Sequence, residues 1–264
     1  MGLLALQGTA YDPDKPWPLD ILGAETEGMI GYLIEQELMN ALPKGAHCAT
    51  LLTRVEVDAD DPAFDAPSKP IGPVYSAAQA EQDTRDHAWT MAAEGTGGQR
   101  RVVPSPLPLR ILGLEAIKAL MDAGHVVICA GGGGIPVCRS DTGEMEGVEA
   151  VIDKDRTAAL LALDLKADAL LLLTDVDAVY QNRGKPDQIS LGRTTPAALG
   201  ALRLAPGSMG PKVAAACDFV AKSGGIAGIG RLQDARAILE GMAGTRILPD
   251  PAESRLTAVY AAQS

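Results

Sequence analysis

The sequence predicts an α/β protein in which a mainly parallel open sheet is covered by helices on both faces, a three-layer αβα sandwich. Strands and helices alternate through the second half of the chain, which is the rhythm of the right-handed βαβ units that build parallel sheets. Apolar residues make up 47% of the 264 residues, whereas aromatic residues make up only 3%. A core of Ala, Leu, Val and Ile is typical of helix-covered parallel sheets. We therefore expect ligands at the carboxyl ends of the strands.

The first expected element is a long amphipathic helix from Pro18 to Leu42. Its apolar residues recur at helical spacing: Leu22, Met29, Ile30, Leu33, Ile34 and Leu38. The glutamates between them are expected to form a solvated face: Glu25, Glu27, Glu35 and Glu37. Because this helix carries more apolar surface than one side of a sheet usually needs, we expect the protein to form a two-fold homodimer.

A strand is expected from Cys48 to Val57, where apolar and β-branched residues alternate. From Asp58 to Pro108 the composition changes to many prolines and polar residues with few apolar runs. We interpret residues 58–108 as a protruding lid subdomain on a single domain that spans residues 1–264. The alternative is a surface hairpin without a catalytic role.

Beyond Pro108 the elements follow one another in regular alternation, with glycines at several of their ends. The expected helices cover residues 112–124, 156–167, 210–225 and 231–244, and the expected strands cover residues 125–130, 169–174 and 226–230. This order predicts crossover connections between neighbouring parallel strands.

Composition excludes several classes of function. The formal net charge of −11 leaves no basic stripe to neutralise phosphates, so we expect small-molecule partners and no nucleic acid. No segment approaches the roughly 20 apolar residues of a membrane span, and no basic leader precedes the first apolar run, so no membrane partner is expected. The four cysteines have no C-x-x-C spacing, which favours reduced thiols in a cytoplasmic protein. The three scattered histidines are not expected to bind metal or to catalyse.

Four segments place chemical groups where a strand gives way to a loop or helix. They are AGGGGIPV (130–137), EAVIDKDRTAALLA (149–162), LLLLTDVDAVY (170–180) and GSMGPKVAAA (207–216). The backbone of the glycine run can approach an anion closely because it carries no side chains. The run matches neither a Walker loop nor a dinucleotide fingerprint, and taken alone it could simply reverse the chain.

Two lysines stand where a helix is expected to begin. Lys154 precedes the helix that starts at Arg156, and Lys212 opens the helix that follows Gly207-Ser208-Met209-Gly210-Pro211. The positive end of a helix dipole disfavours a cation, so each lysine is expected to face an anion. A transferring phosphoryl group would suit both lysines. Asp153 and Asp175 could be purely structural helix or turn caps.

These four segments, together with those at 18–38, 61–75 and 100–108, closely resemble the carbamate kinase family of the amino acid kinase superfamily. The resemblance extends from Gly2 to Pro249 and implies an amino acid kinase-like fold. It also implies reversible phosphoryl transfer between ATP and carbamate, giving ADP and carbamoyl phosphate, with Mg²⁺ bridging the nucleotide phosphates. In this family the reaction often belongs to arginine catabolism or to other catabolism that yields carbamoyl groups.

The resemblance also implies roles for individual residues. Lys212 would contact the nucleotide phosphates, Lys154 would steady the transferred group, and Asp155 would organise the two lysines. Lys69, on the protruding lobe, would reach the phosphate, although its sequence context alone indicates only a solvated loop lysine. Beside the carbamate would lie Gly132, Gly133 and Gly134. The nucleotide would be bound by Asp175, Tyr180 and Met209.

One departure from the family pattern concerns the start of the chain. Family members open with a βαβ unit that carries Gly-Gly-Asn-Ala and His-Gly-Asn-Gly-Pro-Gln loops, and neither motif occurs in this sequence. We therefore expect an N-terminally truncated form with little or no kinase activity. The alternatives are a catalytically impaired homologue that serves as a binding or assembly subunit, and a related kinase for another small carboxylate.

Overall fold

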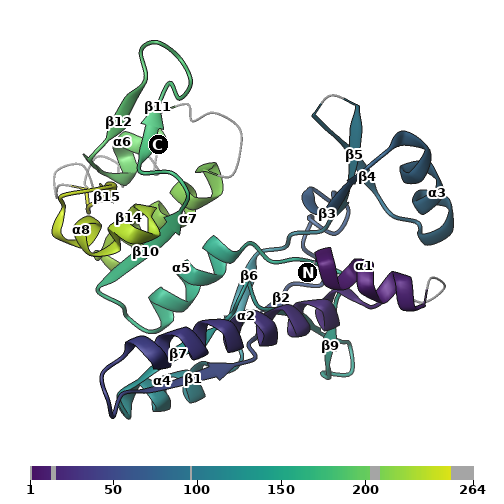
Figure 1. Cartoon of the computed structure of the whole chain (residues 1–264), viewed down its shortest axis with the longest axis horizontal. Helices are drawn as coiled ribbons and strands as arrows, with labels where there is room; N and C mark the ends of the chain where they lie inside the picture. Colours follow the sequence, from purple (N-terminus) through teal and green to yellow (C-terminus); the bar gives the residue numbers. More distant parts are fainter. Residues whose placement is uncertain (1, 13–15, 96, 203–208, 251–264) are drawn as a thin grey trace. The chain divides into compact units, whose positions relative to one another are not determined.

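The computed structural model describes residues 2–12, 16–95, 97–202 and 209–250, and the chain divides into two compact units (Figure 1). The first unit is Met1–Thr157 and the second is Ala158–Ser264. Both contain helices packed on strands, so the expected α/β class is confirmed. None of the helices in these described stretches is long and apolar enough to cross a membrane.

The first unit is built from helices and three small sheets. In chain order its elements are α1 (Gly2–Tyr11), α2 (Leu19–Ala41), β1 (His47–Leu51), β2 (Arg54–Val57), β3 (Lys69–Tyr75), α3 (Ala77–His87), β4 (Met91–Glu94), β5 (Gly98–Val103), β6 (Pro108–Ile111), α4 (Leu114–Asp122), β7 (His125–Cys129), β8 (Ile135–Arg139) and β9 (Met145–Gly147). Strands β1 and β7 pair in parallel, and β2 pairs in parallel with β8 in the sheet ordered β6-β2-β8-β9.

Helix α2 has the length that the apolar spacing predicts, but its solvated face is not the expected one. It packs on β1, β7 and β8. Glu27 is 3% exposed and belongs to the packed face, whereas Tyr32, Leu33 and Ile34 are exposed. The expectation for Glu27 was therefore wrong. A glutamate that accepts a hydrogen bond inside the unit can be buried at positions where helical spacing alone assigns a charge to solvent.

The single strand expected from Cys48 to Val57 is divided into β1 and β2, which join different sheets. The division falls at Leu52 and Thr53. Thr53 makes hydrogen bonds outside the ladders: its N–H donates to Glu27 Oε2 at 2.8 Å, and its Oγ1 donates to Leu51 O at 2.9 Å. These bonds lie where the chain turns between β1 and β2, so one alternating run becomes two short strands.

The proline-rich excursion forms a three-stranded antiparallel sheet, ordered β3-β5-β4, together with α3. Ser76 caps α3 by accepting a hydrogen bond from the N–H of Gln79, as Ser does at many helix starts. The segment therefore has regular structure of its own rather than the single surface hairpin of the alternative interpretation.

The second unit contains a four-stranded sheet ordered β10-β14-β15-β13 and a separate two-stranded hairpin. Its elements are α5 (Lys154–Asp164), which begins in the first unit, then β10 (Ala169–Thr174), β11 (Val179–Gln181), β12 (Ile189–Leu191), β13 (Arg193–Thr194), α6 (Pro196–Gly200), α7 (Met209–Ser223), β14 (Ile226–Arg231), the 3-10 helix η1 (Leu232–Asp234), α8 (Ala235–Glu240) and β15 (Thr245–Ile247). Strands β10 and β14 are parallel, as the βαβ rhythm predicts.

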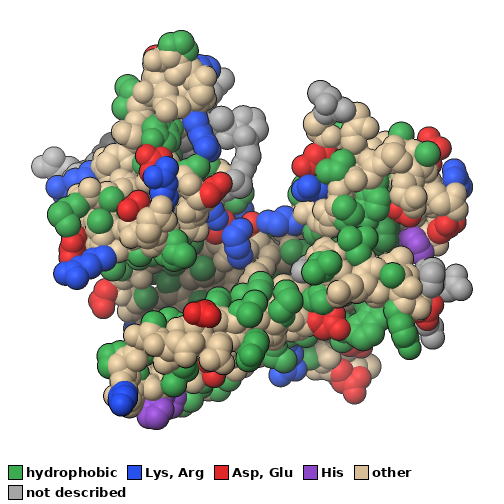
Figure 2. Space-filling model, viewed as in Figure 1, with side chains coloured by type: hydrophobic (Ala, Val, Ile, Leu, Met, Phe, Trp, Pro, Cys, Tyr) green, Lys and Arg blue, Asp and Glu red, His purple; other side chains and the backbone are tan. Residues whose placement is uncertain are grey.

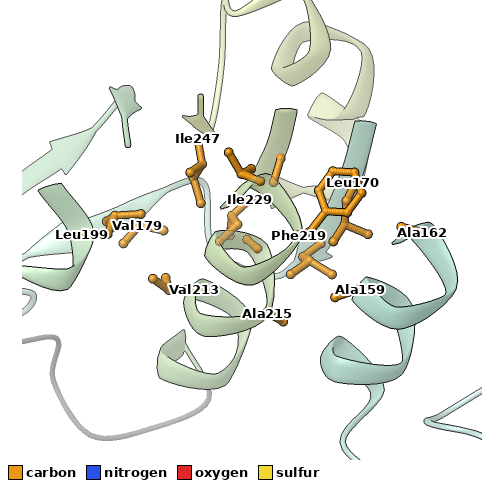
Figure 3. Packing of buried hydrophobic residues seen from close by; sticks show 14 residues of the cluster. Ala159, Ala162, Leu170, Val179, Leu199, Val213, Ala215, Phe219, Ile229 and Ile247 are labelled. Carbon is orange, nitrogen blue, oxygen red and sulfur yellow. The ribbon is translucent and has the colours of Figure 1, made fainter. Parts of the chain in front are cut away.

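The core of the second unit lies between its sheet and α7. Phe219 and Val220 of α7 are fully buried and pack with Leu170 of β10 and Ile229 of β14 (Figure 3). Small residues allow this close packing, since Ala215 and Ala216 face the same cluster. The turn predicted at 207–211 was wrong in its last three residues, because Met209, Gly210 and Pro211 already belong to α7 and Lys212 is the fourth helical residue rather than the first. Gly207 and Ser208 lie outside the described residues.

Candidate active site

Two of the predicted motifs meet at one cavity of the first unit. The cavity has a volume of about 270 Å³ and is lined by the glycine loop between β7 and β8, by the start of β3 and by α2. Gly132 and Gly134 contribute backbone from the loop, Lys69 contributes from β3, and Thr26 contributes from α2. A lysine and a bare backbone on one small cavity suit an anionic ligand. Lys69 and the glycine loop, which are more than 60 residues apart in the sequence, therefore line the same cavity.

The glycine loop has a shape that requires glycine. Gly133 has φ +120°, and a Cβ built on it would lie 2.2 Å from the carbonyl oxygen of Ile152. The N–H of Gly133 donates to Ala130 O at 2.9 Å, and its own carbonyl accepts from Thr157 Oγ1 at 2.7 Å. The loop is thus fastened to the segment that begins α5. Any side chain at this position would push the two segments apart.

Helix α5 begins at Lys154, two residues earlier than expected, and Asp153 caps it. Asp153 Oδ1 accepts hydrogen bonds from the backbone N–H groups of Asp155 at 3.0 Å and Arg156 at 3.3 Å. Lys154 is therefore the first helical residue, where a cation is electrostatically unfavourable. Its Nζ lies 4.0 Å from Asp155 Oδ2, and the lysine side chain is 60% exposed while that of Asp155 is 7% exposed.

The sequence interpretation missed the contact that joins the excursion to α5. Lys69 Nζ donates to the second carboxylate oxygen of Asp153, Oδ2, at 2.6 Å. Burial raises the pKa of Asp153, but the hydrogen bond and charge of Lys69 together with the backbone N–H groups of Arg156 and Asp155 outweigh it, so the pKa of this carboxyl is held below its usual range. Lys69 is thus a paired, half-buried lysine rather than a solvated loop residue. No local signal could reveal a partner 84 positions away.

The remaining predicted residues lie in the second unit. Lys212 is in the first turn of α7 and is buried, at 5% exposure, and Met209 begins the same helix and packs against the hydrophobic core. Asp175 follows β10 and is exposed. The hydroxyl of Thr174, and more weakly the charges of Arg183 and Lys212, hold its pKa below the usual range.

Tyr180 lies on β11, in the hairpin that follows Asp175. Its hydroxyl donates to Asp177 Oδ2 at 2.9 Å, and this hydrogen bond raises the pKa of Tyr180 and lowers that of Asp177. This hydrogen bond fixes the orientation of the phenol. The sequence analysis gave Asp177 no role, although this residue stands in the LLLLTDVDAVY segment and binds the Tyr180 hydroxyl.

Comparison with known proteins connects this geometry to a family. Residues 36–229 match the model of the amino acid kinase family. A carbamate kinase of Haemophilus influenzae is 52% identical over 247 residues, which cover 94% of this chain and 79% of the relative. A carbamate kinase of Rhizobium meliloti is 52% identical over 249 residues, covering 94% of this chain and 76% of the relative.

A solved carbamate kinase structure also shares the fold of this chain. Carbamate kinase from Giardia lamblia bound to AMP-PNP superimposes with a TM-score of 0.85 and 39% sequence identity, covering 94% of this chain and 81% of that one. The matching family model and the shared fold define a protein of the amino acid kinase class. The chain belongs to the carbamate kinases within the amino acid kinase family.

Proposed function

We propose that the protein catalyses reversible phosphoryl transfer between ATP and carbamate, giving ADP and carbamoyl phosphate, rather than being the form with little or no kinase activity that the missing Gly-Gly-Asn-Ala and His-Gly-Asn-Gly-Pro-Gln motifs led us to expect. One observation carries the site-level proposal: Lys69 lines the same cavity as the glycine loop and is held by the residue that caps α5. The curated carbamate kinases that share about half of their residues with this chain support the choice of substrate.

The substrate end of the site is assigned to the first unit. Gly132, Gly133 and Gly134 would form the loop beside the carbamate, with Gly133 fixing the shape of the loop against Ile152. Lys69 would contact the phosphate and Lys154 would steady the transferred phosphoryl group. Asp153 would aim Lys69 toward the cavity, because its carboxylate fixes the ammonium group at 2.6 Å.

The nucleotide end is assigned to the second unit. Lys212 would contact the phosphates, and Asp155 would organise Lys154 and Lys212. Asp175, Tyr180 and Met209 would hold the nucleoside. Among the described residues no group of three or more His, Cys, Asp or Glu side chains could hold a metal by itself. We propose from the family resemblance that Mg²⁺ would arrive with the nucleotide and be held mainly by its phosphates, as Mg²⁺ usually is.

The chemistry requires little beyond position and charge. Carbamate already presents a nucleophilic oxygen, so no enzymic base is needed to activate it. The charge of a transferring phosphoryl group spreads over its equatorial oxygens, where fixed cations and backbone N–H groups stabilise it. Lysines at two helix starts and a glycine loop supply both kinds of group.

We also propose that the protein is a two-fold homodimer that uses α2, and that residues 58–108 act as a lid. On α2 the side chains of Tyr32, Leu33 and Ile34 are 64%, 55% and 43% exposed. Figure 2 shows hydrophobic side chains exposed over this helix. Burial of such a surface against a second copy would remove it from water. The four free cysteines fit a reducing, cytoplasmic setting.

The proposal is tested by measuring ATP formed from ADP and carbamoyl phosphate in the presence of Mg²⁺, with luciferase as the detector. Acetyl phosphate in place of carbamoyl phosphate tests selectivity among acyl phosphates. In the forward direction, glutamate or N-acetylglutamate should produce no ADP above background. Turnover with glutamate would instead indicate a kinase for another carboxylate. Nucleotide binding without any turnover would indicate a binding or assembly protein.

A further inference from the structure

Glu27 is a buried carboxyl group directly behind the glycine loop. It follows Thr26, which lines the cavity, and it is 3% exposed. Its Oε2 accepts the N–H of Thr53 at 2.8 Å, whereas its Oε1 is buried with no hydrogen-bond partner among the described residues. A Cβ built on Gly131 would lie 3.6 Å from the Glu27 Cα, so the loop packs directly on this residue.

Thr53 joins Glu27 to both ends of the loop. The N–H of Ala130, just before the four glycines, donates to Thr53 Oγ1 at 2.9 Å. The N–H of Ile135, just after them, donates to Thr53 O at 2.8 Å. Thr53 is 1% exposed, and its hydroxyl proton is used by Leu51 O. The oxygen is therefore oriented to accept from Ala130.

We propose that Glu27 is a positioning residue for the substrate-binding glycine loop and acts through Thr53. The proposal rests on the assignment of this loop to carbamate and carbamoyl phosphate. A buried carboxyl with one unsatisfied oxygen is unfavourable for stability alone, and apolar groups of similar shape often replace such groups without loss. We infer that the buried carboxyl of Glu27 serves to fix Thr53, which binds both ends of the glycine loop.

Two pairs of variants test the relay, each with a conservative partner. Glu27→Ala removes the acceptor for the Thr53 N–H, whereas Glu27→Gln keeps an acceptor oxygen. Thr53→Val removes the acceptor for the Ala130 N–H at nearly constant volume, whereas Thr53→Ser keeps it. We expect Glu27→Ala and Thr53→Val to raise the KM for carbamoyl phosphate roughly tenfold, the scale of losing one buried hydrogen bond. The KM for ADP should stay within about twofold.

The conservative variants and an exposed control complete the design. Glu27→Gln, Thr53→Ser and Glu37→Ala, which changes an exposed glutamate of the same helix, should keep both KM values near wild type. Equal KM values in all variants of an active protein would overturn the proposal. So would a parallel rise of both KM values, which indicates general loss of structure. If Glu27→Ala does not fold, Thr53→Val decides the question.

A measurement that needs no turnover separates this proposal from the proposed function. Hydrogen exchange should show faster exchange of the Ala130 and Ile135 amides in Glu27→Ala than in Glu27→Gln, with unchanged exchange in β10. Equal exchange at Ala130 and Ile135 in the two variants would overturn the relay, whether or not the protein turns over carbamoyl phosphate. A protein that shows the exchange difference without turnover would refute only the proposed function.

Discussion

Replacing Glu27 by Gln should change how the stability of the first unit depends on pH. Burial raises the pKa of Glu27 and the hydrogen bond from Thr53 offsets part of that rise, so that the net pKa moves from 4.5 to about 7. The folded protein therefore binds this proton more tightly than the unfolded chain does. The resulting stabilisation is fully present below pH 4.5 and is lost as the pH rises through 7.

The size of the effect follows from the shift. A change of one pKa unit corresponds to about 1.36 kcal/mol. Between pH 4.5 and pH 8 the unfolding free energy of the wild type should therefore fall by roughly 3 kcal/mol relative to that of Glu27→Gln. Glutamine does not titrate, and all other groups cancel in the difference. The neighbouring Cys129 thiol stays neutral in this range, because burial and the charge of Glu27 raise its pKa to about 11.

Urea unfolding at several pH values measures this difference. Trp17 and Trp89 are the only tryptophans of the chain and both belong to the first unit, so their fluorescence reports its unfolding. The unfolding free energies of wild type and Glu27→Gln should diverge steadily from pH 5 to pH 7, with the wild type becoming the less stable relative to the variant. If the difference in unfolding free energy between the two proteins stays constant within about 0.5 kcal/mol over this pH range, the reasoning is refuted. A pKa shift of even one unit would change that difference by more than this amount.

Other substitutions test the site and the surface. Lys212→Ala and Lys154→Ala should each lower kcat by roughly 10², the scale of losing one preorganised charge; near-normal turnover with a lower Tm would show a structural role. Gly133→Ala should destabilise the first unit by about 2 kcal/mol or more, because its Cβ meets a backbone carbonyl at a positive φ; an unchanged urea midpoint would contradict this. Leu33→Arg should give a monomer by light scattering, and a monomeric wild type at micromolar concentration would refute the dimer.

Local patterns were sufficient to predict the parts of the fold that depend on local chemistry. The spacing of apolar residues predicted α2, and the alternation of short apolar runs with amphipathic segments predicted the parallel pair β10 and β14. The glycine run and the Asp-Lys-Asp segment were expected to belong to one site, and the bond from Thr157 to Gly133 joins their segments. The cap role considered for Asp153 is confirmed.

The contacts that local patterns missed are long-range. Helical spacing assigned Glu27 to solvent, because spacing cannot show that Thr53 lies within hydrogen-bonding distance of its carboxylate. The same bond helps to divide one predicted strand into β1 and β2. The Lys69 to Asp153 pair is likewise a product of the excursion folding back onto the start of α5. Such pairs form only in the tertiary structure, and local sequence patterns do not show which distant residues come into contact there.

The central claim is that the phosphoryl group of carbamoyl phosphate is passed to ADP in this site. Phosphorus NMR of the protein with ADP, Mg²⁺ and carbamoyl phosphate follows that group directly. We predict that the carbamoyl phosphate signal is replaced by the γ-phosphate of ATP in equal amount, and that Lys212→Ala slows the exchange roughly 100-fold. Conversion of carbamoyl phosphate to inorganic phosphate alone, or no enzyme-dependent loss of its signal, would contradict the account.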